Sequence, residues 1–262
     1  MKSTLRFKVA SKASFYHLLI SVLIASVISL LVFQIWYPHP YELLSGGRNL
    51  FFLLVGVDVV CGPLLTLLIF SPFKSRREIF FDLALISLVQ IAAMVYGLHA
   101  AYQARPLFLV HEVDRFRVIS MPDYSDADVV TALAKLPPSL QPHWYQRPKV
   151  SGIRPPKNNE ERQDVMFESM FGGRDYSQRP DFYVPYDTNY QTTALARAKP
   201  LKAFIAKYPD SAEAAEDILK TRNITLDDAL FLPVIHKQEW IAVMDKSAQI
   251  LGFLPGDGFE VQ

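Results

Sequence analysis

Three long runs of apolar residues occupy the first part of the chain, and a mixed polar sequence follows them. The runs cover residues 15–36, 50–70 and 79–101. A helix rises about 1.5 Å per residue, so each run is long enough to cross a hydrocarbon core of roughly 30 Å. The pattern predicts a membrane protein with a three-helix anchor over residues 15–103, followed by a soluble α+β domain over residues 104–262.

Basic residues mark one side of the predicted membrane segments. The tail of residues 1–14 carries four Lys or Arg residues, and the loop between the second and third runs carries three. The loop after the first run carries one. Because cytoplasmic loops are enriched in Lys and Arg, the N-terminus is expected to be cytoplasmic. We therefore predict a multi-pass membrane protein with residues 104–262 on the outer side of the membrane, which in a bacterium is the periplasm.

A cleaved signal peptide is the competing interpretation of the first run. Its apolar region would be roughly 7–15 residues long and would end in small residues. The run here ends in Phe33-Gln34-Ile35-Trp36-Tyr37, which is bulky and aromatic. This pattern favours an uncleaved anchor with aromatic residues at the membrane interface.

One helical face of the second run carries its single charge together with small and polar residues. Residues three or four apart share one side of a helix, and small residues there let helices approach closely. Gln90 in the third run is expected at a similar depth in the membrane. The candidate intramembrane helix-contact face consists of Asp58, Cys61, Gly62, Pro63, Thr66 and Gln90.

Three interpretations of this face are open. In the first, the three helices pack on one another, and Gln90 or a serine satisfies Asp58. In the second, the face binds a membrane helix of another protein. In the third, Asp58 serves a proton or ion relay, although three helices with one mid-membrane carboxylate make a poor transport path. Asp82, near the inner end of the third run, is expected to form a local ion pair with Lys74 or its basic neighbours.

The polar half predicts short strands and helices that together form a small antiparallel sheet with helices around it. Residues 137–157 are rich in proline and are expected to be loop. Strands are predicted at 107–119, 231–235, 240–245 and 250–254, the last two as a hairpin, and helices at 158–171, 192–207 and 212–221.

Two groups of side chains in the polar half invite a functional interpretation. Asp114 and Arg115 form a polar pair, but neighbours on a strand point to opposite faces, so we expect no joint site. Five aromatic residues fall between positions 176 and 190, and they either form an interaction surface or pack over the core of the domain. This candidate periplasmic interaction surface is Tyr176, Phe182, Tyr183, Tyr186 and Tyr190.

Composition removes several classes of function. Residues 1–103 have a net charge of +4 and residues 104–262 a net charge of −3, so neither half has the basic excess typical of nucleic-acid binding. The single cysteine, Cys61, lies in the second run, so the polar half has no disulfide. The six histidines are scattered, and neither zinc-site spacing nor a phosphate-binding glycine motif is present. We expect no catalytic residues, no metal and no cofactor.

The first half of the chain carries a set of short motifs that together point to a known family. They are Trp36-Tyr37-Pro38-His39-Pro40, Gly56-Val57-Asp58, Cys61-Gly62-Pro63-Leu64-Leu65-Thr66, Phe81-Asp82-Leu83, Gln90, Tyr96-Gly97, Arg105-Pro106 and Val113-Asp114-Arg115-Phe116. In these motifs the chain resembles the TfpX/TfpZ family of type IV pilin accessory proteins. The resemblance covers roughly residues 15–118, and a second segment near 243–254 also matches. It implies an inner-membrane protein that is needed for normal assembly of a particular pilin, and it implies no catalytic residues and no cofactor.

The sequence thus predicts a non-enzymatic, chaperone-like accessory factor that contacts type IV pilin directly, with the lipid bilayer as its second partner. Two alternatives belong to other classes. One is a membrane-bound regulator or sensor that acts through a membrane partner, because its cytoplasmic segments are short. The other is an enzyme that modifies pilin or envelope glycan, which the lack of a nucleophile or acid–base cluster disfavours.

Overall fold

The computed structural model describes residues 2–124 and 128–261. Their contacts divide the chain into two compact units. The helical unit lies within residues 1–42 and 46–104, and the sheet unit lies within residues 43–45 and 105–262.

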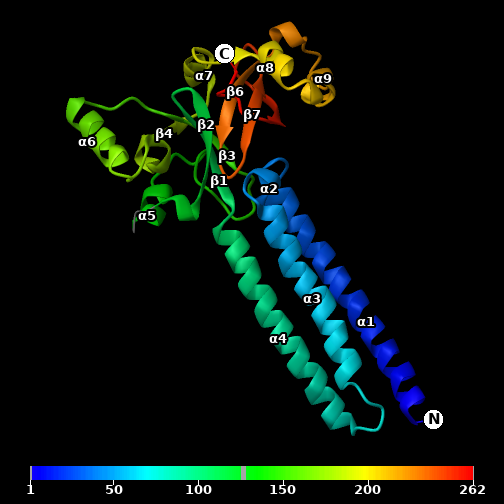
Figure 1. The fold of residues 1–262 in the computed structure, drawn as a ribbon. Coiled ribbons are helices and arrows are strands. Elements are labelled where there is room, and N and C mark those ends of the chain that lie inside the picture. Colours follow the sequence, from blue (N-terminus) through cyan, green and yellow to red (C-terminus); the bar gives the residue numbers. More distant parts are fainter. Residues whose placement is uncertain (1, 125–127, 262) are drawn as a thin grey trace. The chain divides into compact units, whose positions relative to one another are not determined.

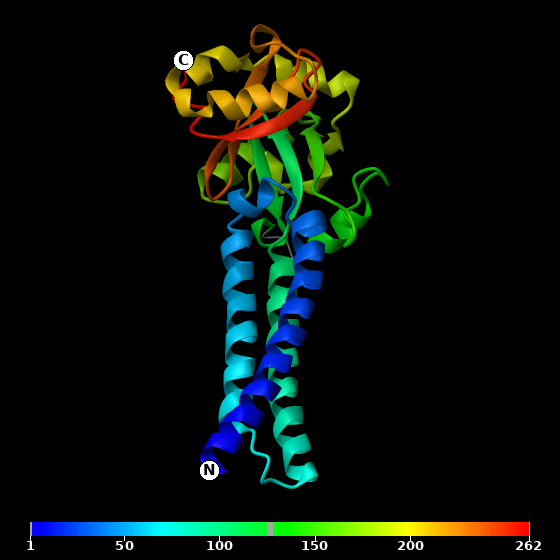
Figure 2. The ribbon, with the colours of Figure 1, turned by 90° about the vertical axis from the view of Figure 1, so that its right-hand side faces the viewer.

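Three long helices run side by side in the helical unit (Figures 1 and 2). They are α1 (Lys2–Leu31), α3 (Gly47–Ile69) and α4 (Arg76–Gln103), and a π-helical turn, Val32–Trp36, continues α1. The single turn α2 (Tyr41–Leu44) lies between α1 and α3 in the sequence. Each long helix is apolar enough and long enough to span a membrane. α3 is the central helix, because it packs extensively on both α1 and α4.

Local sequence signals fix the ends of these helices. Ser75 and Glu78 form a capping box at the start of α4, each side chain bonding the backbone N–H of the other. Lys74 Nζ donates to Asp82 Oδ2 over 2.6 Å, which confirms the predicted ion pair. At the other end, the Tyr37 hydroxyl donates to the Ala101 carbonyl over 2.9 Å and ties the end of α1 to α4.

An eight-stranded mixed sheet forms the sheet unit, so the prediction of a small antiparallel sheet was wrong. The strand order is β4-β3-β1-β2-β6-β7-β8, with β5 paired to β6. β1 is parallel to β3 and β2 is parallel to β6, whereas the other pairs are antiparallel. The strands are β1 (Pro106–Glu112), β2 (Arg115–Ser120), β3 (Lys149–Ile153), β4 (Tyr183–Pro185), β5 (Lys199–Pro200), β6 (Leu230–Ile235), β7 (Glu239–Met244) and β8 (Ile250–Pro255).

Two features of the sequence concealed this sheet. The single strand predicted at 107–119 is a hairpin, and its tight turn places Val113 at φ 58°, where a β-branched residue is rarely found. Because β1 is buried on both faces, no alternation of polar and apolar residues marks it as a strand of its own. β3 lies among the prolines of residues 137–157, where the composition predicts only loop.

Short helices surround the sheet, and two of them, α8 and α9, lie over its β6–β7 part (Figure 1). The predicted helix at 192–207 is interrupted by β5, where Pro200 bonds as part of a strand pair. The predictions at 158–171 and 212–221 are confirmed, the first with Asn158 as N-cap and Gly172 at φ 79° after its end. The helices are α5 (Val129–Ala134), α6 (Asn159–Met170), α7 (Thr188–Leu195), α8 (Leu201–Lys207) and α9 (Ala212–Lys220).

Two clusters of buried side chains stabilise the sheet unit. One joins the start of β1, including Leu107 and Phe108, to α5 and to Leu136 and Leu140 behind it. The other joins β6, β7 and β8 to α8 and α9. The predicted C-terminal hairpin is confirmed, with β7 and β8 paired from Met244–Ile250 to Trp240–Pro255.

Candidate functional site

The predicted helix-contact face of α3 is divided between the two neighbouring helices. Gly62 lies under Gln90 of α4, so closely that a Cβ on Gly62 would stand 2.1 Å from Gln90 Nε2. Thr66 is buried, and its Oγ1 lies 2.6 Å from Nδ1 of His17 on α1. These two positions therefore serve packing within the helical unit.

Pro63 and Cys61 lie on opposite sides of this packing. Pro63 is buried, and its carbonyl accepts a 2.7 Å hydrogen bond from the Ser14 hydroxyl on α1. The Cys61 thiol is free, and the residue is exposed on the outside of the unit. Cys61 is therefore separate from the contacts that hold α3 in place.

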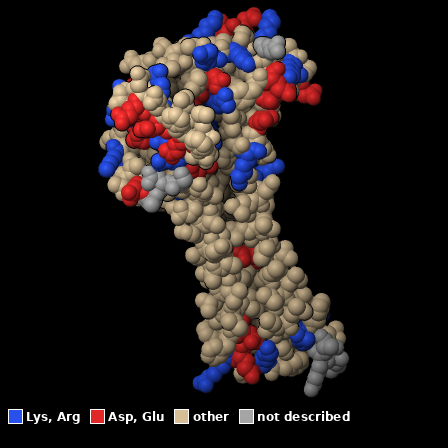
Figure 3. Space-filling view, turned by 60° about the vertical axis from the view of Figure 1, so that its left-hand side comes forward, with Lys and Arg blue, Asp and Glu red and all other residues tan. Residues whose placement is uncertain are grey.

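The Asp58 carboxylate has no hydrogen-bond or ion-pair partner within the described part of the chain. Gln90 Nε2 does reach Asp58, but it donates over 3.0 Å to the backbone carbonyl of that residue. Asp58 is the only charged residue between Arg48 and Lys74. Figure 3 accordingly shows acidic atoms within an otherwise uncharged stretch of the helical unit. Gln90 therefore bonds the main-chain carbonyl of Asp58 and not, as the sequence predicts, its carboxylate.

A pocket of about 150 Å³ opens beside Asp58. Side chains of all three long helices line it, and most of them are apolar. Its polar lining residues are His17, Ser21, Asp58, Ser87 and Gln90. A half-buried carboxylate without a described partner, two serine hydroxyls, one amide and one imidazole thus line one cavity in an apolar bundle.

Two of the five residues of the predicted aromatic surface are buried in the sheet unit. Phe182 and Tyr183 are 1% and 5% exposed. The hydroxyls of Tyr183 and Tyr124 are 3.0 Å apart, and burial raises the pKa of both phenols. Tyr176 is half-buried, with its ring edge-on to Phe182. The second of the two interpretations, packing over the core, therefore describes Phe182 and Tyr183.

The two remaining tyrosines connect distant parts of the sheet unit. The Tyr186 hydroxyl donates to the Ala248 carbonyl over 3.0 Å, which ties the segment after β4 to the β7–β8 turn. The Tyr190 hydroxyl lies 2.9 Å from Nδ1 of His111, a fully buried residue of β1. Burial lowers the pKa of His111 to about 4, so this imidazole is neutral at neutral pH. Sequence patterns gave no signal for this His–Tyr pair, since the two residues are far apart in the chain.

A groove of about 780 Å³ lies at the end of β1 where the hairpin turns. Val113, Ile153 and Met166 give it an apolar lining, and His111 and Tyr190 also face it. Arg162 on α6 lines the groove with its side chain exposed and without an ion pair to any described residue. Further exposed apolar side chains on α6 and directly after it are Phe167, Met170 and Phe171.

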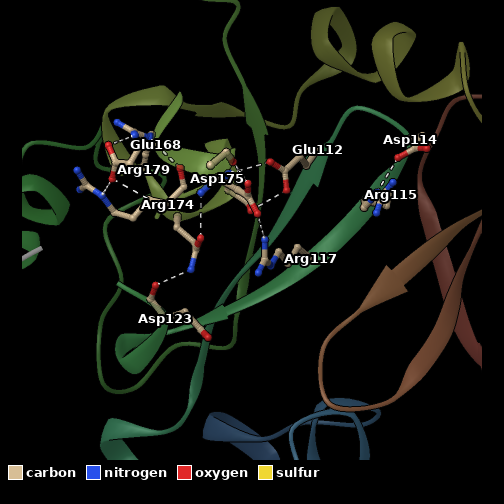
Figure 4. Close-up of polar contacts among 12 residues, drawn as sticks. Glu112, Asp114, Arg115, Arg117, Asp123, Glu168, Arg174, Asp175 and Arg179 are labelled. Carbon is tan, nitrogen blue, oxygen red and sulfur yellow. Dashed lines mark hydrogen bonds and ion pairs between the residues drawn. The ribbon is translucent and has the colours of Figure 1, made fainter. Parts of the chain in front are cut away.

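A polar network holds the segment after α6 against the β1–β2 hairpin (Figure 4). Arg117 Nη1 donates to Asp175 Oδ2 over 2.6 Å, and the Ser177 hydroxyl donates to Glu112 Oε2 over 2.7 Å. Asp114 accepts a 2.7 Å bond from Arg115 Nε, so the expectation that these two point apart was wrong. They flank the start of β2 at the turn, where strand alternation does not apply. A neighbouring cluster is formed by Glu168, Arg174 and Arg179.

Within residues 2–124 and 128–261, no group of three or more His, Cys, Asp or Glu side chains is arranged to hold a metal ion. The polar clusters of the sheet unit are instead ion pairs between side chains of opposite charge.

Comparison with known proteins identifies the family. A family model described as fimbrial assembly protein FimB matches residues 5–46. The chain is 35% identical over 259 residues to the serogroup I fimbrial assembly protein of Dichelobacter nodosus. The aligned region covers 98% of this chain and 98% of that relative. The chain is also 35% identical over 261 residues to the serogroup E1 protein of that organism, again over 98% of both chains. The chain belongs to the fimbrial assembly protein family.

Other fimbrial assembly proteins match in part. The serogroups C1 and C2 protein of the same organism is 42% identical over 118 residues, which are 45% of this chain and 90% of that relative. No solved structure matches the chain. For this fimbrial assembly family member, the relatives support the broader part of the predicted resemblance, a role in fimbrial assembly. The FimB description stands in place of the TfpX/TfpZ family name.

Proposed function

We propose that this chain is a non-enzymatic, membrane-anchored accessory factor that holds a type IV pilin subunit before the subunit joins a filament. Full-length similarity to fimbrial assembly proteins supports the process, and three apolar helices of membrane-spanning length support the location. The excess of Lys and Arg in the N-terminal tail and the second loop supports a cytoplasmic N-terminus. The sheet unit then lies in the periplasm, beside the pilin head.

The Asp58 carboxylate carries the membrane part of the proposal. A charged group at mid-membrane depth costs roughly 2.5–3.5 kcal/mol unless it has a partner or faces a bundle interior. Asp58 lines a pocket among α1, α3 and α4, and no described side chain bonds its carboxylate. A hydrogen-bond donor on a client helix would complete this arrangement. We therefore assign the pocket to the apolar N-terminal helix of the pilin.

The groove beside α6 supports a second contact in the sheet unit. Its apolar lining and exposed Arg162 suit a surface segment of the pilin head that carries both apolar and acidic side chains. Two separate contacts, one in the membrane and one in the periplasm, would let the factor select one pilin type. The internal bonds of Tyr183, Tyr186 and Tyr190 assign those residues to supporting this groove and its surroundings.

The test compares two carboxylates in the same unit. Asp58→Asn removes the charge from the pocket, and we expect it to reduce co-purification of pilin from native membranes severalfold. Asp82→Asn is the matched control, because the partner of Asp82 is Lys74 of the same chain. Both variants should remain in the membrane fraction. Equal pilin recovery with Asp58→Asn and with the unaltered chain would overturn the assignment of the pocket to a client helix.

A further inference from the structure

An aromatic turn in the sheet unit is exposed to solvent without being part of the groove or the core. It comprises residues 143–146, closed by a 3.1 Å bond from the Gln146 N–H to the His143 carbonyl. Trp144 and Tyr145 are 57% and 55% exposed, although both are large aromatic residues. Because exposed tryptophan is unusual in a soluble domain, the turn calls for a partner.

The rings of this turn are held in a fixed arrangement. The imidazole of His143 stacks on Tyr145, with ring centroids 5.4 Å apart and planes 7° apart. The Trp144 indole stands edge-on to Tyr145 at 5.7 Å. Two bonds fix the chain around the turn, from Gln141 Nε2 to the Leu136 carbonyl over 2.9 Å and from Lys149 Nζ to the Ser139 carbonyl over 2.6 Å. The aromatic turn is therefore ordered, and hydrogen bonds hold the loop that carries it.

Strand register places this loop at the end of the sheet where the chain leaves α4. α4 ends at Gln103, and β1 begins at Pro106. β3 runs parallel to β1 and starts with Lys149 opposite Phe108, so the residues just before Lys149 extend toward the start of β1. Leu136 and Leu140, at the base of the loop, are buried in the same cluster as Leu107 and Phe108.

We infer that residues 143–147 dock on the outer surface of the lipid bilayer and hold the sheet unit at the membrane. The occupant that chain connectivity favours is the headgroup layer beyond α4, because only Ala104 and Arg105 separate α4 from β1. Trp and Tyr favour that layer because an apolar ring and a polar N–H or O–H can both be satisfied there. Arg147, which is exposed beside the turn, suits anionic headgroups. This inference rests on the membrane placement in the proposed function, but not on pilin binding.

Quenching of tryptophan fluorescence tests the inference on the full chain. The protein is reconstituted into phosphatidylcholine–phosphatidylglycerol vesicles that carry bromine on the upper part of the acyl chains. The signal of Trp144 is the difference between the unaltered chain and Trp144→Phe. We expect bromolipid to reduce that difference by at least half.

The control moves the tryptophan to another exposed aromatic position. In a Trp144→Phe, Phe171→Trp double variant, the new indole replaces a side chain that is 85% exposed and directly follows α6. We expect its fluorescence to be unchanged by bromolipid. Resistance to alkaline extraction shows that each variant is inserted.

Two results overturn the inference. One is an unquenched Trp144 in an inserted chain, and the other is equal quenching at both positions. If Trp144 is unquenched while pilin still co-purifies, bilayer docking fails and the proposed function stands. If Trp144 is quenched but Asp58→Asn leaves pilin recovery unchanged, the proposed function fails and bilayer docking stands. A Trp144 that is protected only by added pilin would assign the turn to a protein partner and would contradict the inference.

Discussion

Replacing Tyr190 by Phe tests whether the aromatic residues after α6 support the fold. The Tyr190 hydroxyl is the hydrogen-bond partner of His111 Nδ1 at 2.9 Å. His111 is fully buried, and its Nε2 already has no protein partner. Tyr190→Phe keeps the ring that packs on Gly152 but leaves both imidazole nitrogens without a partner.

The cost follows from the burial of that imidazole. A buried polar group that loses its partner destabilises the folded state by about 1–3 kcal/mol. For a domain of this size, each kcal/mol lowers the melting temperature by roughly 2–4 °C. We therefore expect Tyr190→Phe to lower the melting temperature of the sheet unit clearly.

Thermal unfolding of the full chain in detergent, followed by the near-ultraviolet circular dichroism of the aromatic residues, measures this change. Tyr176→Phe is the matched control, because the Tyr176 ring packs on Phe182 while its hydroxyl bonds no described residue. We expect the control to shift stability by at most about 0.5 kcal/mol. Equal unfolding midpoints for Tyr190→Phe and Tyr176→Phe would contradict this expectation, since His111 would then not depend on the Tyr190 hydroxyl.

Two further predictions concern pH and helix packing. Because burial lowers the His111 pKa from 6.5 to about 4, the unfolded chain binds a proton that the folded chain excludes between these values. This part of the stability is complete above the unfolded pKa and is lost as pH falls toward the folded pKa, by on the order of 3 kcal/mol. His111→Gln should flatten the dependence of the melting midpoint on pH, and an unchanged slope would contradict the assignment. In the helical unit, Gly62→Val should displace Gln90 from the Asp58 carbonyl and destabilise the bundle by roughly 0.6–2 kcal/mol. Gly56→Val is its control, because no atom lies within 4 Å of a Cβ there, and equal unfolding of both variants by dodecyl sulfate would contradict the packing.

The three long helices of the helical unit could be predicted from the sequence, because long apolar runs mark them directly. Long apolar runs form helices wherever backbone polar groups have no water to bond, and α3 and α4 extend slightly beyond the predicted runs. The ion pair between Asp82 and Lys74 could also be predicted from the sequence, since both residues lie close together at one helix end. The sequence did not predict that the Asp58–Gly62–Thr66 face is divided between α1 and α4. The spacing of residues on one helix does not show which neighbouring helix each residue contacts.

The sheet unit was harder to predict because its pairings join distant segments. The parallel pairs β1–β3 and β2–β6 leave no local turn signal, and Val113 occupies a turn position that usually carries Gly, Asn or Asp. The hydrogen bond between His111 and Tyr190 and the groove near it depend on that topology. The C-terminal hairpin was predicted correctly because its strands are adjacent in the sequence and its turn is short.

Photo-crosslinking in native membranes tests whether a pilin helix occupies the pocket beside Asp58. A photoreactive residue is placed at Ile24 on α1 or Ile91 on α4, which line the pocket beside Asp58 and are 43% and 53% exposed. Leu23 and Leu88 are the controls on the same helices, because they are exposed but do not line the pocket. We expect pilin adducts from positions 24 and 91 and few or none from positions 23 and 88. Absence of pilin adducts at all four positions of the inserted protein, or equal yields from pocket and control positions, would contradict it.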